Sequence, residues 1–139
     1  MMDGDTIDVL DSDHVKHRIR FLGIDAPEKA QPFGKVSKQV LSDHIFGREV
    51  EVEAQGNDRY GRLLGKILLN GVDQNLLQIK EGLAWHYAHY ASNQFPGDAD
   101  AYSRSEREAR GQGIGLWNDA DPVAPWEWRK SRKGRKAPR

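Results

Sequence analysis

Charged residues in the first half of the chain are grouped in three short phrases. They are Asp3-Gly4-Asp5-Thr6, the stretch from Arg20 to Glu28, and Asp58-Arg59-Tyr60-Gly61-Arg62. Carboxylates can bind a hard cation or accept a proton from water, and arginines can bind a phosphate through two parallel hydrogen bonds. The three phrases together therefore contain the parts needed for metal-assisted chemistry at a phosphodiester.

The acidic residues fit a cation site if the strands bring them together. Asp3 and Asp5 are two positions apart, so in an extended chain they point to the same side, and Asp25 follows the end of the Arg20 strand. Oxygen ligands of this kind suit Ca²⁺ or Mg²⁺. Taken alone, Asp3-Gly4-Asp5 is more typical of a simple turn, because aspartate and glycine are common turn residues.

The remaining candidates each have a functional and a structural interpretation. Glu28 follows Asp25 by three residues on a loop stiffened by Pro27, where it can act as a general base or be an ordinary surface acid. Arg20 and Arg62 can bind a phosphate or be solvated surface residues. The conjunction of the three phrases is more specific than any one of them.

The elements that must position these residues follow from the hydrophobic pattern. Alternation predicts strands over 6–10, 15–24, 49–54 and 60–69 and an extended segment over 84–90. Helical spacing predicts helices over about 33–46, over 74–81 with Asp73 as the N-cap, and from Asp98 to about Ala109. This order predicts a small curled barrel with appended helices and not a parallel βαβ sheet.

Composition limits the remaining possibilities. The 139 residues include no cysteine, which excludes disulfides and a thiolate metal site, and no run approaches the ~20 apolar residues of a membrane span. We expect one domain over 1–128 and a basic, disordered tail over 129–139. The tail holds seven basic residues and no acid, whereas the first 128 residues carry a net charge of −7. Such a tail can be a solvated end or can bind a polyanion.

The three phrases resemble those of the staphylococcal nuclease family. Asn75, Gly82-Leu83-Ala84 and Gly115-Leu116-Trp117 extend the resemblance, which covers about residues 2–118. It implies a mainly β fold, a five-stranded OB-fold barrel with three helices. It also implies a Ca²⁺-dependent nuclease that hydrolyses DNA and RNA with little sequence preference, leaves 3′-phosphate products and acts as a monomer, without a membrane partner.

The resemblance also implies a role for individual residues. Asp5 and Asp25 correspond to the carboxylate ligands of Ca²⁺, with the main-chain carbonyl of Ala26 as a further ligand and Asp3 acting through water. Glu28 corresponds to the general base. The phosphate is expected to be bound by Arg20 and Arg62, and the nucleotide by Arg59, Tyr60 and Tyr90.

Three features depart from the best-known family member. The loop from Glu28 to Gly34 is shorter, and Ala88 stands where that member has a nucleotide-contacting tyrosine. Asp3 lies so close to Met1 that a full first strand has no room, so we expect an upstream strand. An export signal upstream would make the protein secreted or periplasmic, and otherwise we expect it to be cytoplasmic.

Two alternatives to an independent enzyme are considered. A catalytically inactive OB-fold module would bind nucleic acid or protein, but such modules typically lose the carboxylates and arginines that are all present here. An accessory domain of a conjugation or plasmid-maintenance complex would be active only with its partner, and the sequence does not separate it from an independent nuclease.

Overall fold

The main sheet has five strands and mixed polarity. The computed structural model describes residues 3–136, except for the side chains of Tyr90 and of residues 132–136. The strands are β1 (Thr6–Leu10), β2 (Lys16–Phe21), β4 (Glu51–Asn57), β5 (Leu63–Leu69) and β6 (Val72–Asp73). The order is β1-β2-β5-β4, with β6 beside β5. β2 and β5 are parallel and the other neighbours antiparallel.

A two-stranded ribbon lies beside the main sheet and carries part of the candidate site. The strand predicted over 15–24 is interrupted after β2 by a turn at Gly23, whose φ of 86° suits glycine. The chain then forms β3 (Ile24–Asp25), which pairs with β7 (Trp85–His86). The extended segment predicted over 84–90 is thus a strand only at β7, and a 3₁₀ helix follows over Ala88–Asn93.

Local sequence signals account for several turns and caps. Asn70 and Gly71 have φ values of 51° and 80°, as a type I′ hairpin turn requires, and they join β5 to β6. The Asp73 side chain accepts a hydrogen bond from the Leu76 amide at 3.0 Å, which confirms it as the N-cap of α2 (Gln74–Lys80).

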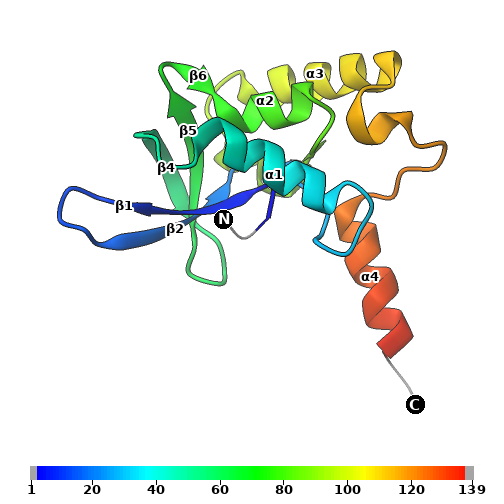
Figure 1. Ribbon diagram of the computed structural model, residues 1–139, viewed down its shortest axis with the longest axis horizontal. Helices are drawn as coiled ribbons and strands as arrows, with labels where there is room; N and C mark the ends of the chain where they lie inside the picture. Colours follow the sequence, from blue (N-terminus) through cyan, green and yellow to red (C-terminus); the bar gives the residue numbers. More distant parts are fainter. Residues whose placement is uncertain (1–2, 137–139) are drawn as a thin grey trace.

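The other α-helices are α1 (Gly34–Ile45), α3 (Asp98–Gln112) and α4 (Pro125–Lys136), and a short 3₁₀ helix covers Gly115–Asn118. α1 buries Ser37, Leu41 and Ile45, which lie four positions apart on one face. α2 contacts both β5 and α3. Figure 1 shows α4 extending away from the rest of the molecule.

Two apolar clusters hold the elements together. The first joins the sheet to the helices and includes Ile19, Phe21, Leu41, Ile67, Ile79 and Tyr102. The second contains Trp85, Leu116 and Ala124, with Phe33, Trp117 and Trp126 packed against them. This second cluster fixes the segment that leads into α4 against the body of the protein.

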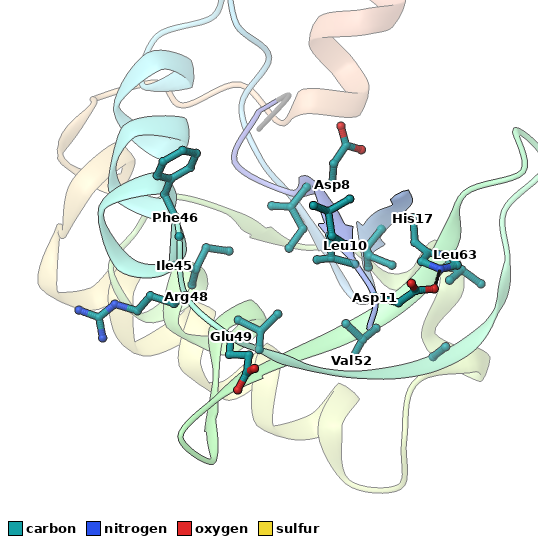
Figure 2. Close-up of a pocket in the computed structure, with 16 residues that line it drawn as sticks. Asp8, Leu10, Asp11, His17, Ile45, Phe46, Arg48, Glu49, Val52 and Leu63 are labelled. Carbon is teal, nitrogen blue, oxygen red and sulfur yellow. Dashed lines mark hydrogen bonds and ion pairs between the residues drawn. The ribbon is translucent and has the colours of Figure 1, made fainter. Parts of the chain in front are cut away.

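The expected barrel is not closed within residues 3–136. β1 and β4 are the two ends of the strand order and do not pair with each other. A pocket of about 740 Å³ lies along this opening, and Figure 2 shows Leu10, Ile45, Val52 and Leu63 among the side chains around it. The sheet therefore stays open on one side, because β1 and β4 do not pair with each other.

The prediction of three helices is wrong, and residues 129–136 of the tail predicted over 129–139 belong to a helix. The described residues contain four α-helices, and α4 continues to Lys136. The basic composition suggested a solvated tail, but proline at the first helical position favours a helix start, and Trp126 packs against the second cluster. Residues 137–139 lie outside the described residues. No helix over residues 3–136 is long and apolar enough to cross a membrane.

Candidate active site

One pocket of about 330 Å³ brings the three charged phrases together. It is lined by Asp3, Asp5, Arg20, Asp25, Glu28, Arg59, Tyr60, Arg62, Tyr87, His89 and Arg129. The carboxylates and arginines that were candidates from the sequence thus share one site, and a fourth arginine, Arg129, joins them from α4. The pocket lies apart from the larger apolar opening of Figure 2, because the two have no lining residue in common.

The Asp3-Gly4-Asp5 phrase is a tight turn that is packed against α1. Asp3 and Thr6 form an antiparallel bridge, and the Asp3 side chain accepts a hydrogen bond from the Asp5 amide at 3.2 Å. A Cβ at Gly4 would lie 1.9 Å from the Ser37 hydroxyl oxygen. Glycine is therefore required for this close approach, and the turn fixes the position of both carboxylates.

Asp5 is a buried carboxylate with fixed oxygens. Its Oδ2 accepts a hydrogen bond from the Ala26 amide at 2.7 Å, and its Oδ1 accepts one from the Thr6 hydroxyl at 3.0 Å. Burial alone would raise the pKa of Asp5, but the nearby Arg20 charge and these hydrogen bonds outweigh it and lower the pKa. Asp5 is therefore ionised and rigid.

Burial disfavours the ionised forms of Asp25 and Asp3 more than their neighbours stabilise them. Asp25 is 1% exposed, and burial raises its pKa to about 6 although arginines lie beside it. Burial and then the neighbouring Asp5 charge raise the pKa of Asp3 to about 8. Both shifts mean that an additional cation in the pocket would stabilise the ionised carboxylates.

Arg20 connects the two acidic phrases. Its Nη1 donates to the carbonyl oxygens of Phe21 at 2.8 Å and Ile24 at 2.7 Å. Its Nη2 lies 3.2 Å from Asp25 Oδ1 and 3.6 Å from Asp5 Oδ2. Since only 8% of this residue is exposed, Arg20 holds the turn between β2 and β3 and faces the pocket from a fixed position.

Arg62 is oriented by Asp58. The two Asp58 oxygens accept hydrogen bonds from the amides of Tyr60 and Arg62 and from Arg62 Nε, the last at 2.7 Å. Asp58 belongs to the third phrase, but sequence reasoning gave it no role. The signal was its place at the start of a turn, where aspartate commonly accepts backbone hydrogen bonds.

Tyr60 and Arg59 form the exposed side of the pocket. Tyr60 is 70% exposed, and the Arg59 and Arg62 guanidinium carbons lie 5.2 Å and 5.6 Å from the centre of its ring. An exposed aromatic ring beside two cations suits a nucleotide, because the base can stack and the phosphate can pair. Tyr90 belongs by its backbone to the 3₁₀ helix Ala88–Asn93, and its side chain lies outside the described residues.

Glu28 is held through its backbone, which leaves its side chain on the pocket. Its amide donates to Gln31 Oε1 at 3.0 Å, and its carbonyl accepts from the Gln31 amide at 2.9 Å. The side chain is 33% exposed, so solvent water can reach the carboxylate. The short loop from Glu28 to Gly34 is thus anchored at its first residue.

Arg129 lies in the pocket although the sequence did not predict it as a site residue. Its Nη2 lies 2.8 Å from Asp25 Oδ2, and its Nη1 lies 3.3 Å from Asp25 Oδ1 and 3.7 Å from Glu28 Oε1. Burial would lower the pKa of Arg129, but the hydrogen bonds and charge of Asp25 raise it. Nothing in the sequence indicated that an arginine of the basic segment over 129–139, which lies 104 positions from Asp25, enters the pocket.

With this geometry established, comparison with known proteins identifies the family. Residues 18–119 match the family described as staphylococcal nuclease homologue. The chain belongs to the staphylococcal nuclease family. The family prediction made from the three phrases is confirmed.

Several relatives within the staphylococcal nuclease family carry nuclease names. A micrococcal nuclease of Shigella flexneri is 42% identical, and the alignment covers 96% of this chain and 79% of that protein. An uncharacterized endonuclease of Haemophilus influenzae is 37% identical over 94% of this chain and 70% of that protein. An uncharacterized endonuclease of Escherichia coli O157:H7 is 41% identical over 93% of this chain and 80% of that protein. These relatives support a hydrolytic nuclease with a nucleic-acid substrate.

The donor atoms of the staphylococcal nuclease pocket suit a hard cation, but their present partners are arginines and amides. Asp3, Asp5, Asp25 and the Ala26 carbonyl offer only oxygen, which is the ligand type that Ca²⁺ prefers. Over the described residues, however, no three acidic or histidine side chains are grouped so that they could hold a metal. Both oxygens of Asp25 accept hydrogen bonds from Arg129, and Arg20 adds a further one.

Proposed function

We propose that this protein is a Ca²⁺-dependent nuclease that hydrolyses the phosphodiester bonds of DNA and RNA with little sequence preference. The main support is the single pocket in which Asp5, Asp25, Glu28, Arg20 and Arg62 meet. As the family resemblance implies, we propose that it acts as a monomer. The nuclease names of the relatives agree with this chemistry.

In this proposal the acidic residues hold the cation. Asp5 and Asp25 would bind Ca²⁺ directly, together with the carbonyl of Ala26, and Asp3 would act through water. When bound, Ca²⁺ supplies positive charge that neutralises the phosphate and polarises its oxygens. The raised pKa values of Asp3 and Asp25 agree with a role in cation binding, since burial without a cation penalises their ionised forms.

Glu28 removes a proton from the attacking water. The water oxygen attacks phosphorus in line with the 5′ oxygen, and the bond between phosphorus and the 5′ oxygen breaks. The 5′ oxygen takes up a proton from solvent, so the products end in a 3′-phosphate and a 5′-hydroxyl. General base catalysis of this kind is typically worth ~10²–10⁴-fold in rate. The position of Glu28 on an anchored loop, with its side chain partly exposed, supports this role.

Arg62 and Arg20 stabilise the charge that develops on the phosphate oxygens. A donor that is positioned in advance for this purpose is typically worth ~10²–10³-fold. Arg59 and Tyr60 bind the flanking nucleotide through charge and stacking, and Tyr90 is proposed to assist. Contacts of this type do not read base edges, which agrees with low sequence preference.

Digestion of plasmid DNA and of a structured RNA tests the proposal. We expect cleavage with Ca²⁺ and none in excess chelator, and we expect labelled products to carry 3′-phosphate ends. The Arg62→Ala variant should lose most of the activity, whereas Arg48→Ala, at an exposed position outside the catalytic pocket, should match the wild type. Equal digestion with Ca²⁺ and with chelator would contradict the cation dependence.

A further inference from the structure

Arg129 occupies the part of the pocket where the proposed cation and base must act. Its guanidinium faces both oxygens of Asp25 and lies within 3.7 Å of Glu28 Oε1. A bidentate arginine–carboxylate pair uses the same oxygen atoms that a metal ligand would offer. Asp25 therefore cannot keep this pair and also present both oxygens to a cation.

The start of α4 is anchored, so Arg129 reaches the pocket from a fixed element. Gln31 Nε2 donates to the Val123 carbonyl, and Ala124 is buried in the second cluster. The Trp126 ring is stacked on Tyr87 with a centroid distance of 5.3 Å, and it meets the Trp85 ring edge-on at 5.5 Å. Arg129 follows Trp126 by one helical turn and thus projects from a packed helix start.

Arg129 and Arg20 differ in how freely they can leave Asp25. Arg20 is almost completely buried and is bound to two carbonyl oxygens as well as to the carboxylates. The Arg129 side chain is 41% exposed, and it forms ion pairs with two acids, Asp25 and Glu28. The Arg129 side chain can therefore move into solvent without breaking the turn that holds the carboxylates.

We propose that Arg129 is a built-in competitor of the divalent cation. Without the cation, its guanidinium neutralises Asp25 and Glu28, and cation binding requires this guanidinium to leave Asp25. The Ca²⁺ concentration needed for activity is then set partly by α4. This inference rests on the proposed Ca²⁺ dependence.

Calcium titration of three metal-stripped proteins by isothermal calorimetry tests the competition. We expect Arg129→Gln to bind Ca²⁺ at least roughly 5-fold more tightly than the wild type, the lower range of typical coupling between two sites. Lys130→Gln is the matched control, because Lys130 is on the same helix, is 78% exposed and pairs with Glu127. Lys130→Gln should bind Ca²⁺ as the wild type does.

The variant Arg129→Lys and an NMR signal of Arg129 test the competition without relying on an activity assay. Arg129→Lys keeps the charge but loses the two-pronged geometry, so its Ca²⁺ affinity should fall between those of the wild type and Arg129→Gln. In the wild type, the NMR signal of the Arg129 Nε–H should shift when Ca²⁺ is added. Near-UV circular dichroism of the tryptophans should show that α4 stays docked in each variant.

The possible outcomes separate the inference from the proposed function. If Arg129→Gln binds Ca²⁺ as tightly as the wild type or more weakly, while wild-type digestion still needs Ca²⁺, then Arg129 does not compete with the cation. The inference is then overturned and the proposed function stands. Weaker binding by Arg129→Gln is the result expected if Arg129 only supports the cation site. If neither protein binds Ca²⁺ and digestion is unaffected by chelator, the proposed cation dependence fails and the inference fails with it.

Discussion

Asp58 determines the position of Arg62 through three hydrogen bonds to a short turn. Two of them hold the backbone of the turn and the third holds the guanidinium. A displacement of a catalytic group by about 1 Å can cost ~10²-fold in rate, even when the group itself is unchanged. Asp58 is therefore expected to matter for catalysis without contacting the substrate.

Replacement of Asp58 by alanine should lower kcat by about 10²-fold because Arg62 loses its orientation. Asp58→Asn keeps one acceptor oxygen for the backbone and should lose less. The matched control is Asp11→Ala, since Asp11 accepts the same kind of turn hydrogen bonds in the β1–β2 hairpin and does not line the catalytic pocket. Steady-state cleavage of a labelled oligonucleotide measures both, and equal rates for Asp58→Ala and Asp11→Ala would contradict the positioning role.

The raised pKa values of Asp25 and Asp3 predict how stability depends on pH in the metal-free protein. Because these carboxyls bind their protons more tightly in the folded state, the free energy of unfolding should fall as pH rises through about 6 and about 8. Asp5 and Asp58 have lowered pKa values, so their effect is confined to acid pH. Saturating Ca²⁺ should reverse the fall, because it binds the folded state.

Urea unfolding in chelator at about pH 5, pH 7 and pH 9 measures this dependence. The same series with Ca²⁺ is the control, in which the loss at the higher pH values should be reduced. A free energy of unfolding that stays constant or increases over this range in chelator would show that the pocket already compensates the charge of Asp3 and Asp25.

At the scale of elements, the turn at Gly4 and helix α1 must approach each other closely. Gly4→Ala would place a methyl group 1.9 Å from the Ser37 hydroxyl oxygen, and overpacking of this kind typically costs ~1–3 kcal/mol. The cost should appear in the free energy of unfolding and also in Ca²⁺ affinity, because the turn carries Asp3 and Asp5.

Gly111→Ala provides the matched control for Gly4→Ala. Gly111 lies inside α3 and a Cβ there meets nothing within 4 Å, so alanine should stabilise the protein by up to ~1 kcal/mol. Chemical denaturation of both variants gives the comparison. An unchanged free energy of unfolding in Gly4→Ala would mean that the turn does not depend on its contact with α1.

Elements defined by local signals could be predicted, whereas those defined by distant partners could not. The three helices up to residue 112, the Asp73 cap and the Asn70-Gly71 turn depend on neighbours in sequence. The pairing of β3 with β7 and the docking of α4 depend on residues far along the chain. Arg129 illustrates the limit, because its partner Asp25 is 104 positions away.

At the scale of the whole molecule, the second apolar cluster links the pocket to α4. Trp126 packs on Tyr87, which lines the pocket, and on Trp85, whose strand pairs with the strand of Asp25. A change in this cluster is therefore expected to reach the catalytic pocket through α4, although the cluster lies outside it.

The Trp126→Ala variant tests this link. Loss of the aromatic contacts should release α4, so trypsin should cleave after Arg129 and Lys130 faster than in the wild type while the sheet stays folded. Far-UV circular dichroism and the sites of cleavage, identified by mass spectrometry, separate release of α4 from global unfolding. Cleavage at the wild-type rate would mean that the contacts of Arg129 and Gln31 are enough to hold α4.

The family and the main pocket residues could be predicted because three phrases together are specific, although each alone is ambiguous. The sequence did not predict the open side between β1 and β4. It also did not predict the hydrogen bonds from Arg129 to Asp25, since both features arise from how the whole chain packs. The roles of the pocket residues in catalysis are the central proposal, and they require a kinetic test.

The most direct test is the cleavage rate of Glu28→Gln with saturating Ca²⁺ and substrate. Glutamine keeps the shape of Glu28 but cannot take a proton from water, so we predict that kcat falls by ~10²–10⁴-fold while Ca²⁺ and DNA affinities stay close to those of the wild type. A wild-type kcat in Glu28→Gln would contradict the assignment of this pocket as the catalytic centre with Glu28 as its base.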